Sequence, residues 1–597
     1  MKQLLIGIDV GSTTTKITVL DKTTESLLYS DYRRHHADQL ASVLFAIRYA
    51  DMAEDSFHQE LLAEGERILK QVTEENRYAV IPASRPYQND PLVNYNLPEM
   101  FTSLGIPVLT ADAVPGVNDV DLTNSRLDVV NNYHARMLGS AVIAAENPHL
   151  EYVQIVSFGC DHDAYLSDEI IRLMKQGSGK IPLVLKLDES EIQGPLRIRV
   201  RSFIETVRMQ REKHEEAPVH ALTDPYPVKY EKKDRKERIV LIPNTSHAFC
   251  RVMSAAMEKQ GLRAEPLPIG RDEAIRLGKK YVHNDICFPA QIVIGEALAA
   301  LKSGKYDGKD VAIATGKYIG DCRLTHYSAL LRKALDDAGF SDVPILTNDD
   351  ADFHNLHPGF RLNLLSALRI AYALPMIDIL EELLRKIRPY ELTKGNADAA
   401  FEQAMDAVID GLSRHGVNGA KHGFEIIEAR MSDVIQKSYF YRDMQVREYH
   451  LHKPLQEKLW YRMADLFFDL AHDAADKIAS AHPLYDRPAV RLPELVKESD
   501  PIIHHTFDAG EGVLIPGEIL HHAAHGCRAF VILQPFGCLP NHVVGRGISK
   551  RLKELYPDVQ ILPLDYDPDV SFANIENRLQ MLIMNAREQE AEKDKTK

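Results

Sequence analysis

The chain has 597 residues, 45% of them hydrophobic and 26% charged, which is typical of a globular protein with about three or four domains. Its formal net charge of −15 argues against nucleic acid as a main partner. No apolar run approaches the ~20 residues that cross a bilayer. The start of the chain predicts a strand rather than a signal peptide, so a cytoplasmic protein is expected.

Residues 4–21 predict a β-hairpin whose turn is rich in hydroxyl groups. The N–H groups and hydroxyls of this turn could bind a phosphate group, while Asp9 could hold Mg²⁺ through water and Lys16 could add a positive charge. A tight Ser- and Thr-rich hairpin without any ligand is the alternative. The candidate nucleotide-binding residues are Asp9, Gly11, Ser12, Thr13, Thr14, Thr15 and Lys16.

The segment Ile6–Ile17 resembles the phosphate-1 loop of the actin/hexokinase/Hsp70 ATPases, and more narrowly that of the activators of 2-hydroxyacyl-CoA dehydratases. Such a domain also needs a second aspartate loop and a glycine-rich adenosine loop, and these activators carry cysteines for a shared cluster. No such segments follow, and no cysteine precedes Cys160. Residues 1–50 are therefore expected to be a truncated, partial ATPase segment, and binding of ATP and Mg²⁺ to it is left open.

Most of the remaining chain predicts an α/β protein, because short apolar strands alternate with helices, a pattern that favours parallel sheets. Residues 209–237 are charged and contain proline, which predicts a linker. Residues 361–480 carry apolar residues at three- and four-residue spacing and predict helices. The expected domains are a first α/β lobe with a helical lead-in at 51–208, a second α/β lobe at 236–360, a helical region at 361–485 and a third α/β lobe at 486–597.

Individual strands are predicted where four or more apolar residues end at a proline, glycine or aspartate. The predicted strands are 78–82, 106–110, 152–157, 181–188, 238–243, 264–268, 311–315, 343–347, 512–516, 531–535 and 559–564. The fold class is therefore α/β, with several Rossmann-like parallel-sheet lobes and a helical insert, preceded by a partial actin/Hsp70-like ATPase hairpin.

Four of the six cysteines stand where a predicted strand or loop passes into a helix. Cys160 and Cys538 each end a Phe-Gly-Cys sequence after an apolar strand, Cys287 precedes Phe-Pro, and Cys322 follows the strand 311–315. Ligands of open α/β sheets bind at such strand ends, and thiolates from scattered loops can hold an iron–sulfur cluster. The alternative is four small buried residues, a common role of cysteine.

Five segments beyond residue 77 resemble the large acyl-CoA dehydratase activase-related proteins, in which an ATPase segment is joined to a region similar to the dehydratase subunits. The segments are Ile81–Pro91, Ser157–Asp161, Ile198–Phe203, Asn284–Pro289 and Gly320–Arg323. The resemblance implies a low-potential iron–sulfur cluster, of the 4Fe-4S type, held by Cys160, Cys287, Cys322 and Cys538. It also implies ATP-coupled electron transfer to acyl-CoA reduction or dehydration, an activator or dehydratase partner protein, and an acyl-CoA substrate.

Two other interpretations stay open at this point. The chain could be a non-redox α/β protein that binds a CoA-like or phosphorylated ligand, or an inert truncated relative. If the chain is an iron–sulfur redox protein, it could be an iron–sulfur-dependent acyl-CoA dehydratase or the reductase that activates one. The sequence therefore leaves enzymatic activity undecided. The remaining cysteines, Cys250 and Cys527, are expected to be packing residues rather than ligands.

Overall fold

The structure is a computed structural model, and it describes most of the chain. The described ranges are 4–10, 14–21, 27–34, 39–129, 131–157, 160–187, 193–213, 219–270, 272–317, 322–347, 357–415, 431–449, 452–480, 485, 490–567 and 572–596. Side chains are outside the description for residues 4–53, 161, 411–415, 431 and 589–596.

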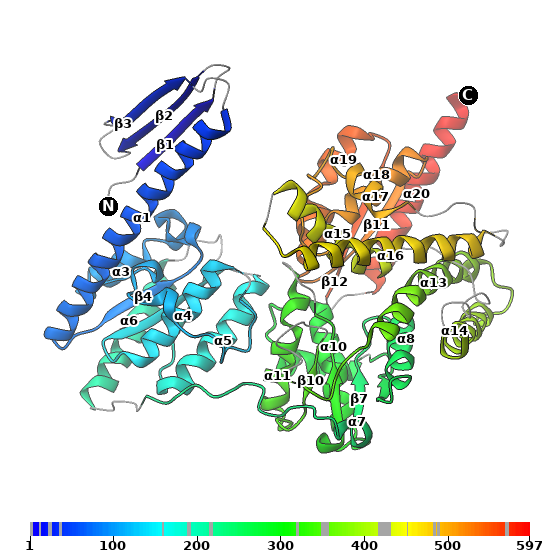
Figure 1. Cartoon of the computed structure of the whole chain (residues 1–597), viewed down its shortest axis with the longest axis horizontal. Helices are drawn as coiled ribbons and strands as arrows, with labels where there is room; N and C mark the ends of the chain where they lie inside the picture. The colour runs from blue at the N-terminus through cyan, green and yellow to red at the C-terminus, as the bar shows by residue number, and fades with distance from the viewer. Residues whose placement is uncertain are drawn as a thin grey trace. The chain divides into compact units, whose positions relative to one another are not determined.

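The chain divides into two compact units, each of which is described by itself (Figure 1). The first unit comprises Met1–Thr123, Asn131–Phe158 and Glu169–Leu222. The second unit comprises Asn124–Val130, Gly159–Asp168 and Thr223–Lys597. Residues 159–168, which include Cys160, therefore group with the second unit, which also contains the other three candidate ligands. The predicted domain boundaries stay predictions.

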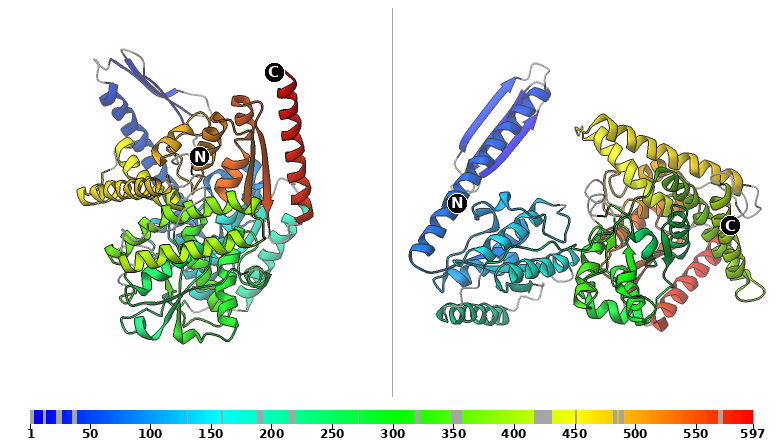
Figure 2. Two further views of the ribbon diagram at one scale, coloured as in Figure 1. Left: turned by 90° about the vertical axis from the view of Figure 1, so that its right-hand side faces the viewer. Right: turned by 60° about the horizontal axis from the view of Figure 1, so that its bottom comes forward.

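The first unit begins with an antiparallel sheet of strand order β1-β2-β3, so the hairpin predicted for residues 4–21 is confirmed. The elements are β1 (Leu4–Val10), β2 (Thr14–Asp21), β3 (Leu27–Arg34) and helix α1 (Gln39–Glu74). This sheet lies along the first half of α1 in both views (Figures 1 and 2). The likeness of this hairpin to an actin-type ATPase stays a prediction.

The rest of the first unit is built on a parallel sheet of order β4-β5-β6. Its elements are β4 (Ala79–Ala83), α2 (Pro91–Asn94), α3 (Leu97–Thr102), α4 (Asn132–Glu146), β5 (Leu150–Ser157), α5 (Asp161–Ser178), β6 (Leu183–Leu187) and α6 (Gln193–Glu212). Apolar residues of α3 and α6 pack on the sheet beside Val153 and Ile155. The strand predicted at 106–110 is reduced to one isolated bridge between Val80 and Val108, made by hydrogen bonds from the Val80 N–H to the carbonyl of Pro107 and from the Leu109 N–H to the carbonyl of Val80. Pro107 has no N–H with which to extend the pairing.

The second unit contains a parallel sheet of order β10-β9-β7-β8. Its elements are α7 (Asp234–Glu237), β7 (Ile239–Ile242), α8 (His247–Glu258), β8 (Arg263–Pro266), α9 (Asp272–Tyr281), α10 (Phe288–Lys302), β9 (Val311–Ala314), α11 (Tyr327–Asp337) and β10 (Ile345–Leu346). The chain leaves β7 toward β8 on one side and then returns to β9 on the other. The loops after β7 and β9 therefore diverge at a switch point, where open α/β sheets bind ligands. The loop after β9 carries Cys322.

Long helices follow, as the apolar spacing of residues 361–480 predicts. They are α13 (Leu364–Ile387), α14 (Asn396–His415), α15 (Met431–Glu448) and α16 (Leu455–Ala479). Their shared core includes Leu374, Ile377, Met405 and Phe468, all nearly inaccessible to solvent. The helical prediction is confirmed.

The last part of the second unit pairs β11 and β12 in parallel. Its elements are α17 (Leu492–Glu498), α18 (Leu514–Ala524), β11 (Ala529–Pro535), α19 (Ser549–Leu555), β12 (Gln560–Tyr566) and α20 (Phe572–Thr596). The strand predicted at 512–516 is wrong, because Leu514 begins α18. Pro516 falls in the first turn of that helix, where a missing N–H costs nothing. A four-residue apolar run cannot by itself separate a strand from a buried helix end.

The described chain is thus a mixed α/β protein, mostly helical, with short parallel sheets, and the predicted fold class is confirmed at that level. The finer description of the lobes as Rossmann-like stays a prediction. Among the described residues, no helix combines the length and apolarity that a membrane crossing requires.

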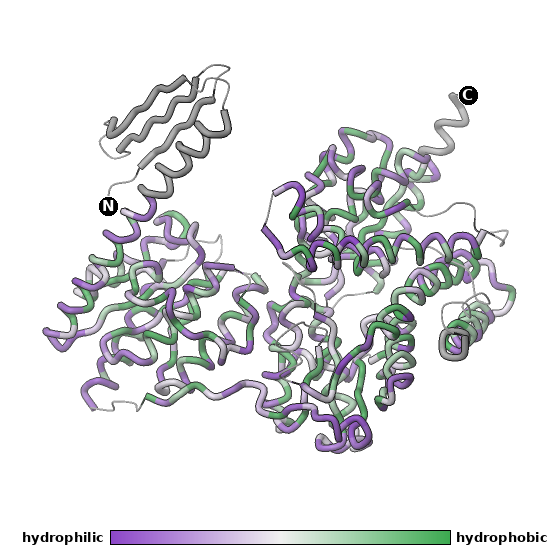
Figure 3. Tube along the Cα trace, in the orientation of Figure 1, coloured by the Kyte–Doolittle hydropathy of each residue, from purple (hydrophilic) through white to green (hydrophobic). Residues whose placement is uncertain are grey.

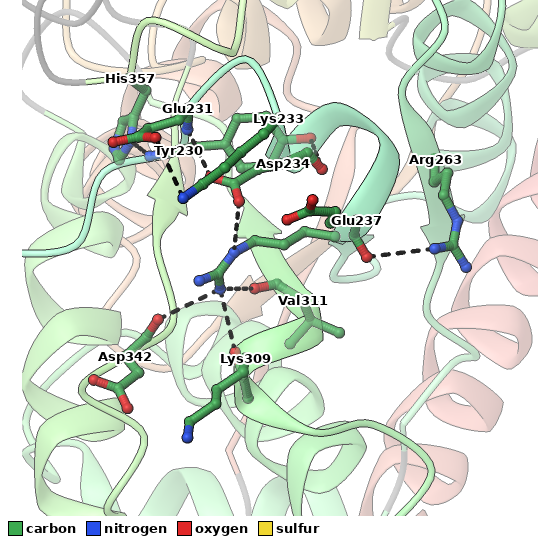
Figure 4. Close-up of polar contacts among 12 residues, drawn as sticks. Tyr230, Glu231, Lys233, Asp234, Glu237, Arg263, Lys309, Val311, Asp342 and His357 are labelled. Atoms are coloured by element: carbon green, nitrogen blue, oxygen red, sulfur yellow. Dashed lines mark hydrogen bonds and ion pairs between the residues drawn. The ribbon is translucent and has the colours of Figure 1, made fainter.

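A buried histidine fixes the segment that enters β7. The N–H of Tyr230 donates a hydrogen bond of 2.9 Å to His357 Nδ1, and the N–H of Gly359 donates to the carbonyl of Tyr230 (Figure 4). Beside them, Arg238 contacts Asp234 and donates to the carbonyl of Val311. Burial lowers the pKa of His357 to about 4, so its imidazole is neutral near pH 7 and Nδ1 can accept.

Acidification is expected to destabilise the protein through His357. In the unfolded chain a histidine binds a proton near pH ~6.5, whereas folded His357 does so only near a pKa of about 4. Between these two values the unfolded state binds the additional proton, so stability is complete above this window and falls as the pH drops through it. The difference between the two pKa values corresponds to at most about 3 to 4 kcal/mol.

The measurement is urea unfolding at about pH 7 and about pH 4.5 for the native chain and for His357→Asn. Asparagine keeps an acceptor oxygen for Tyr230 but cannot be protonated in this range. The variant is expected to lose less stability on acidification than the native chain. Equal losses in both proteins would show that His357 does not control this dependence.

Candidate functional site

Cys287 lies at the start of α10, in the position that caps the helix N-terminus. The residue is buried, and its Sγ lies 3.2 Å from the hydroxyl oxygen of Tyr327 on α11. The N–H of the next residue, Phe288, donates a hydrogen bond of 2.8 Å to the carbonyl of Phe536. This bond ties the Cys287 loop to the chain that follows β11.

Cys538 follows β11 in a turn made by Phe536 and Gly537. Gly537 has a φ of +72° and lies so close to Cys287 that a Cβ there would be 2.9 Å from Cys287 Cα. Only glycine has no Cβ and adopts this backbone conformation at low cost. The glycine of the second Phe-Gly-Cys sequence therefore lets two candidate ligands approach each other.

Cys322 caps the short 3-10 helix Arg323–His326, between β9 and α11. It is half-buried beside the loop before α18, where a Cβ on Gly510 would lie 3.9 Å from Cys322 Sγ and 3.2 Å from Pro540 Cγ. Burial raises the pKa of the Cys322 thiol, and negative charge on Cys287 or Cys538 would raise it further, which places both sulfur atoms near Cys322. Three thiols that are far apart in the sequence are thus brought together within the second unit.

Cys160, the fourth candidate ligand, is half-buried and directly precedes α5. Its carbonyl accepts a hydrogen bond of 3.2 Å from the N–H of Ala164. It belongs to the same compact unit as the other three cysteines. That Cys160 completes the ligand set stays a prediction.

Polar side chains surround the three thiols. The amide nitrogen of Asn541 lies 3.1 Å from Cys538 Sγ and 3.1 Å from a carboxylate oxygen of Glu511, so one amide group contacts both side chains. Lys437 on α15 is fully buried and donates to the carboxylate of Asp508 at 2.5 Å. Burial lowers the pKa of Lys437, and the negative groups around it, which include Glu511 and Cys322, oppose that shift.

Burial keeps the thiols of Cys322 and Cys538 protonated in the absence of a cation. It raises the pKa of Cys322 to about 12 and that of Cys538 to about 11, and the negative charge of Glu511 adds to both shifts. Burial also raises the pKa of Glu511. Several buried acidic groups placed side by side can ionise together only when a positive group compensates their charge.

The chemistry of this donor set fits an iron–sulfur cluster. Thiolates are soft ligands that select zinc, copper(I) or iron–sulfur groups. Within the described residues, no three histidine, cysteine, aspartate or glutamate side chains are spaced to hold one metal ion. Ligands of a cluster surround several irons and therefore lie farther apart than the ligands of a single ion. The sulfur donors are compatible with such a cluster.

The candidate nucleotide-binding residues lie in the first unit. Asp9 is on β1, opposite Lys16 on β2, and Thr14 and Thr15 are also on β2. The side chains of these four residues lie outside the description. For the other three candidate residues, Gly11, Ser12 and Thr13, both the backbone and the side chains lie outside the description.

The two remaining cysteines differ from each other. Cys250 is buried in α8, its thiol donates to the carbonyl of Pro243 at 3.3 Å, and it packs in the core of the four-stranded sheet, as expected. Cys527 is exposed, so its expected packing role is wrong. The run of apolar residues that predicts burial begins only after Cys527, at Ala529.

Sequence reasoning missed the polar neighbours of the thiols, which are Tyr327, Lys437, Glu511 and Asn541. Tyr327 and Glu511 are distant in sequence from the thiols that they contact, Lys437 comes from the distant helix α15, and no local pattern marks these three residues. Asn541 is the exception, since it follows Cys538 by three residues and can fold back on it within one turn.

The fold and the thiol site define a mixed α/β protein that brings together one buried cysteine, Cys287, and two half-buried ones, Cys322 and Cys538. Residues 9–114 match the family described as "CoA enzyme activase uncharacterised domain". This part of the chain is therefore related to CoA enzyme activases, and the match runs from the first hairpin through α1 into the parallel sheet of the first unit. No match was found among curated proteins or among solved structures.

Proposed function

We propose that this chain is an iron–sulfur redox protein of the 2-hydroxyacyl-CoA dehydratase and activator type. The observation that carries the proposal is the meeting of Cys287, Cys322 and Cys538 from three separate segments in one buried place. Cys160, in the same compact unit, is the proposed fourth ligand of a 4Fe-4S cluster. When bound, such a cluster supplies one-electron chemistry at a low potential.

The residues around the thiols have separate roles in this proposal. The Asn541 amide donates to the sulfur of Cys538 and orients the Glu511 carboxylate. The Tyr327 hydroxyl, whose pKa burial raises well above its usual value, stays protonated and can donate to the sulfur of Cys287. Hydrogen bonds to sulfur ligands and a buried cation such as Lys437 favour the thiolate form and tune the potential of a bound group.

The relation of residues 9–114 to CoA enzyme activases supports a general role as an activator of a second enzyme. We propose that the partner is an activator or dehydratase protein whose substrate is an acyl-CoA. In this scheme the chain passes electrons within an ATP-coupled system, and a complete activator supplies the coupling to ATP hydrolysis.

Anaerobic purification followed by iron and sulfide determination tests the proposal. A brown protein with near-stoichiometric iron and sulfide is expected. A colourless protein without iron, purified and reconstituted under anaerobic conditions, would contradict the proposal. That result would favour the alternative of a non-redox protein that binds a CoA-like or phosphorylated ligand.

The purified chain is expected not to hydrolyse ATP at a useful rate. Phosphoryl transfer needs charge stabilisation and positioning from several directions around the γ-phosphate and Mg²⁺. The turn of the first hairpin supplies one phosphate loop, and residues 39–74, which follow the small sheet, form one continuous helix rather than a second nucleotide-binding loop. The measurement is ATPase activity with Mg²⁺ for the native chain and Asp9→Ala. Robust turnover that Asp9→Ala abolishes would show a complete nucleotide site.

A further inference from the structure

Helix α16 exposes a stripe of large apolar side chains. Leu459, Met463, Leu466 and Leu470 are 57, 58, 58 and 50% exposed. Their spacing of four, three and four residues places them on one face of the helix. Figure 3 shows hydrophobic and hydrophilic residues interleaved along α16. Four neighbouring exposed residues of this size differ from the single exposed apolar residues of an ordinary surface.

The opposite face of α16 is already used by the fold. Tyr461, Phe468 and Ala475 are buried and lie on the side of the helix away from the stripe. Phe468 and Ala475 pack in the core shared with α13. The helix is therefore apolar on two opposite faces, and in the part of the chain that the structure describes only one of them is buried. A helix that is apolar on both faces is expected to be covered on both.

The charges along α16 differ on the two sides of the centre of the stripe, which falls between Ala464 and Asp465. Before Asp465 the helix carries two basic residues and one acidic residue, which are Lys458, Arg462 and Glu457. From Asp465 onward it carries four acidic residues and one basic residue, which are Asp465, Asp469, Asp473, Asp476 and Lys477. An antiparallel copy of the same helix, centred on the stripe, would place the more basic part of each helix against the acidic part of the other.

We propose that α16 is a self-association surface, on which two copies of this chain pack antiparallel about a two-fold axis. In a two-fold interface the same patch serves both partners, so the patch must complement itself. Antiparallel pairing places Met463 opposite Leu466 of the second copy and Leu459 opposite Leu470. The spacing of these residues is that of a short coiled-coil seam.

Arg462 and Asp469 are the charges that flank this seam. They are seven residues apart on the same side of the helix. Antiparallel pairing therefore brings Arg462 of each copy beside Asp469 of the other copy. Arg462 contacts Asp443 but is 63% exposed, and Asp469 accepts a hydrogen bond from Gln436. Arg462 is thus exposed and Asp469 half-buried, so both retain accessible surface with which to contact a second copy.

The oligomeric state of the full chain tests the proposal. Light scattering coupled to size exclusion under anaerobic conditions is expected to give twice the 67.3 kDa mass of one chain. Leu466→Glu is expected to reduce this to the mass of one chain. Ile198→Glu is the matched control, because Ile198 on α6 is also an exposed apolar helix residue, at 69%, and its variant is expected to remain a dimer. A monomeric native chain, or a dimer unaffected by Leu466→Glu, would overturn the proposal.

A charge exchange tests the antiparallel arrangement itself. Arg462→Glu and Asp469→Arg are each expected to be monomeric, because each places like charges together at both ends of the seam. An equal mixture of the two variants is expected to form a heterodimer, since both flanking pairs then have opposite charges. A mixture that stays monomeric while each variant remains folded would rule out this pairing and point to a different protein as the occupant.

Discussion

Cys287→Ala is expected to lower the iron content of the purified protein to a small fraction of that of the native chain. Cys287 is buried between the turn after β11 and Tyr327 of α11. A cluster that loses one of its thiolates is held by fewer bonds and carries an open iron. The measurement is iron and sulfide per chain after anaerobic reconstitution.

The control for this experiment is Cys527→Ala. Cys527 is exposed in the turn before β11 and is not a candidate ligand, so its removal is expected to leave iron and sulfide unchanged. Circular dichroism of both variants distinguishes a lost ligand from a lost fold. If Cys287→Ala and Cys527→Ala retained the same iron, the three thiols would not be the ligands of one group.

Gly537→Ala is expected to destabilise the protein and to reduce its iron content as well. A non-glycine residue in the left-handed region costs roughly 1–2 kcal/mol, and Gly537 has a φ of +72°. The added Cβ would also lie 2.9 Å from Cys287 Cα and 3.1 Å from Cys287 N, which are backbone atoms that cannot rotate away. The overlap must push the Cys287 and Cys538 segments apart.

Gly526→Ala is the control that separates the effect of backbone strain from the effect of steric overlap with Cys287. Gly526 has a φ of +99°, and no atom lies within 4 Å of a Cβ built on it. This variant is expected to lose stability through backbone strain alone and to keep its iron. Urea unfolding gives the stability change, and iron determination reports on the site. An equal loss of iron in the two variants would mean that the distance between Cys287 and Cys538 does not govern binding.

Much of the fold could be predicted because apolar runs of four or more residues are bounded by proline, glycine or charge. Residues 238–243 and 311–315 become β7 and β9 on this basis. The same rule fails at 512–516, where Pro516 lies in the first turn of a helix instead of ending a strand. Local sequence does not distinguish these outcomes, since the choice depends on the packing of α18 against α17.

The thiol site could be predicted only in part. Cys287, Cys322 and Cys538 could be predicted as candidate ligands because they lie where a strand or loop passes into a helix, near glycine or proline. Ordinary core packing does not require a cysteine in such a position. The surroundings could not be found in this way. Lys437 comes from a long helix, and Glu511 from a loop where nothing in the neighbouring residues distinguishes it from a surface acid. Their proximity to the thiols results from tertiary packing alone.

The order of the ligands along the chain has a consequence for biosynthesis. Cys287 and Cys322 belong to the four-stranded sheet, whereas Cys538 comes after the helices α13–α16. A ribosome that adds ~5–20 residues per second needs on the order of 10–40 s to pass from Cys322 to Cys538. During that interval two of the sulfur atoms have been made while the third has not, so their pocket is incomplete. A cluster held by these three thiols would consequently be inserted late, largely after translation, and the nascent thiols would need a reducing environment until then.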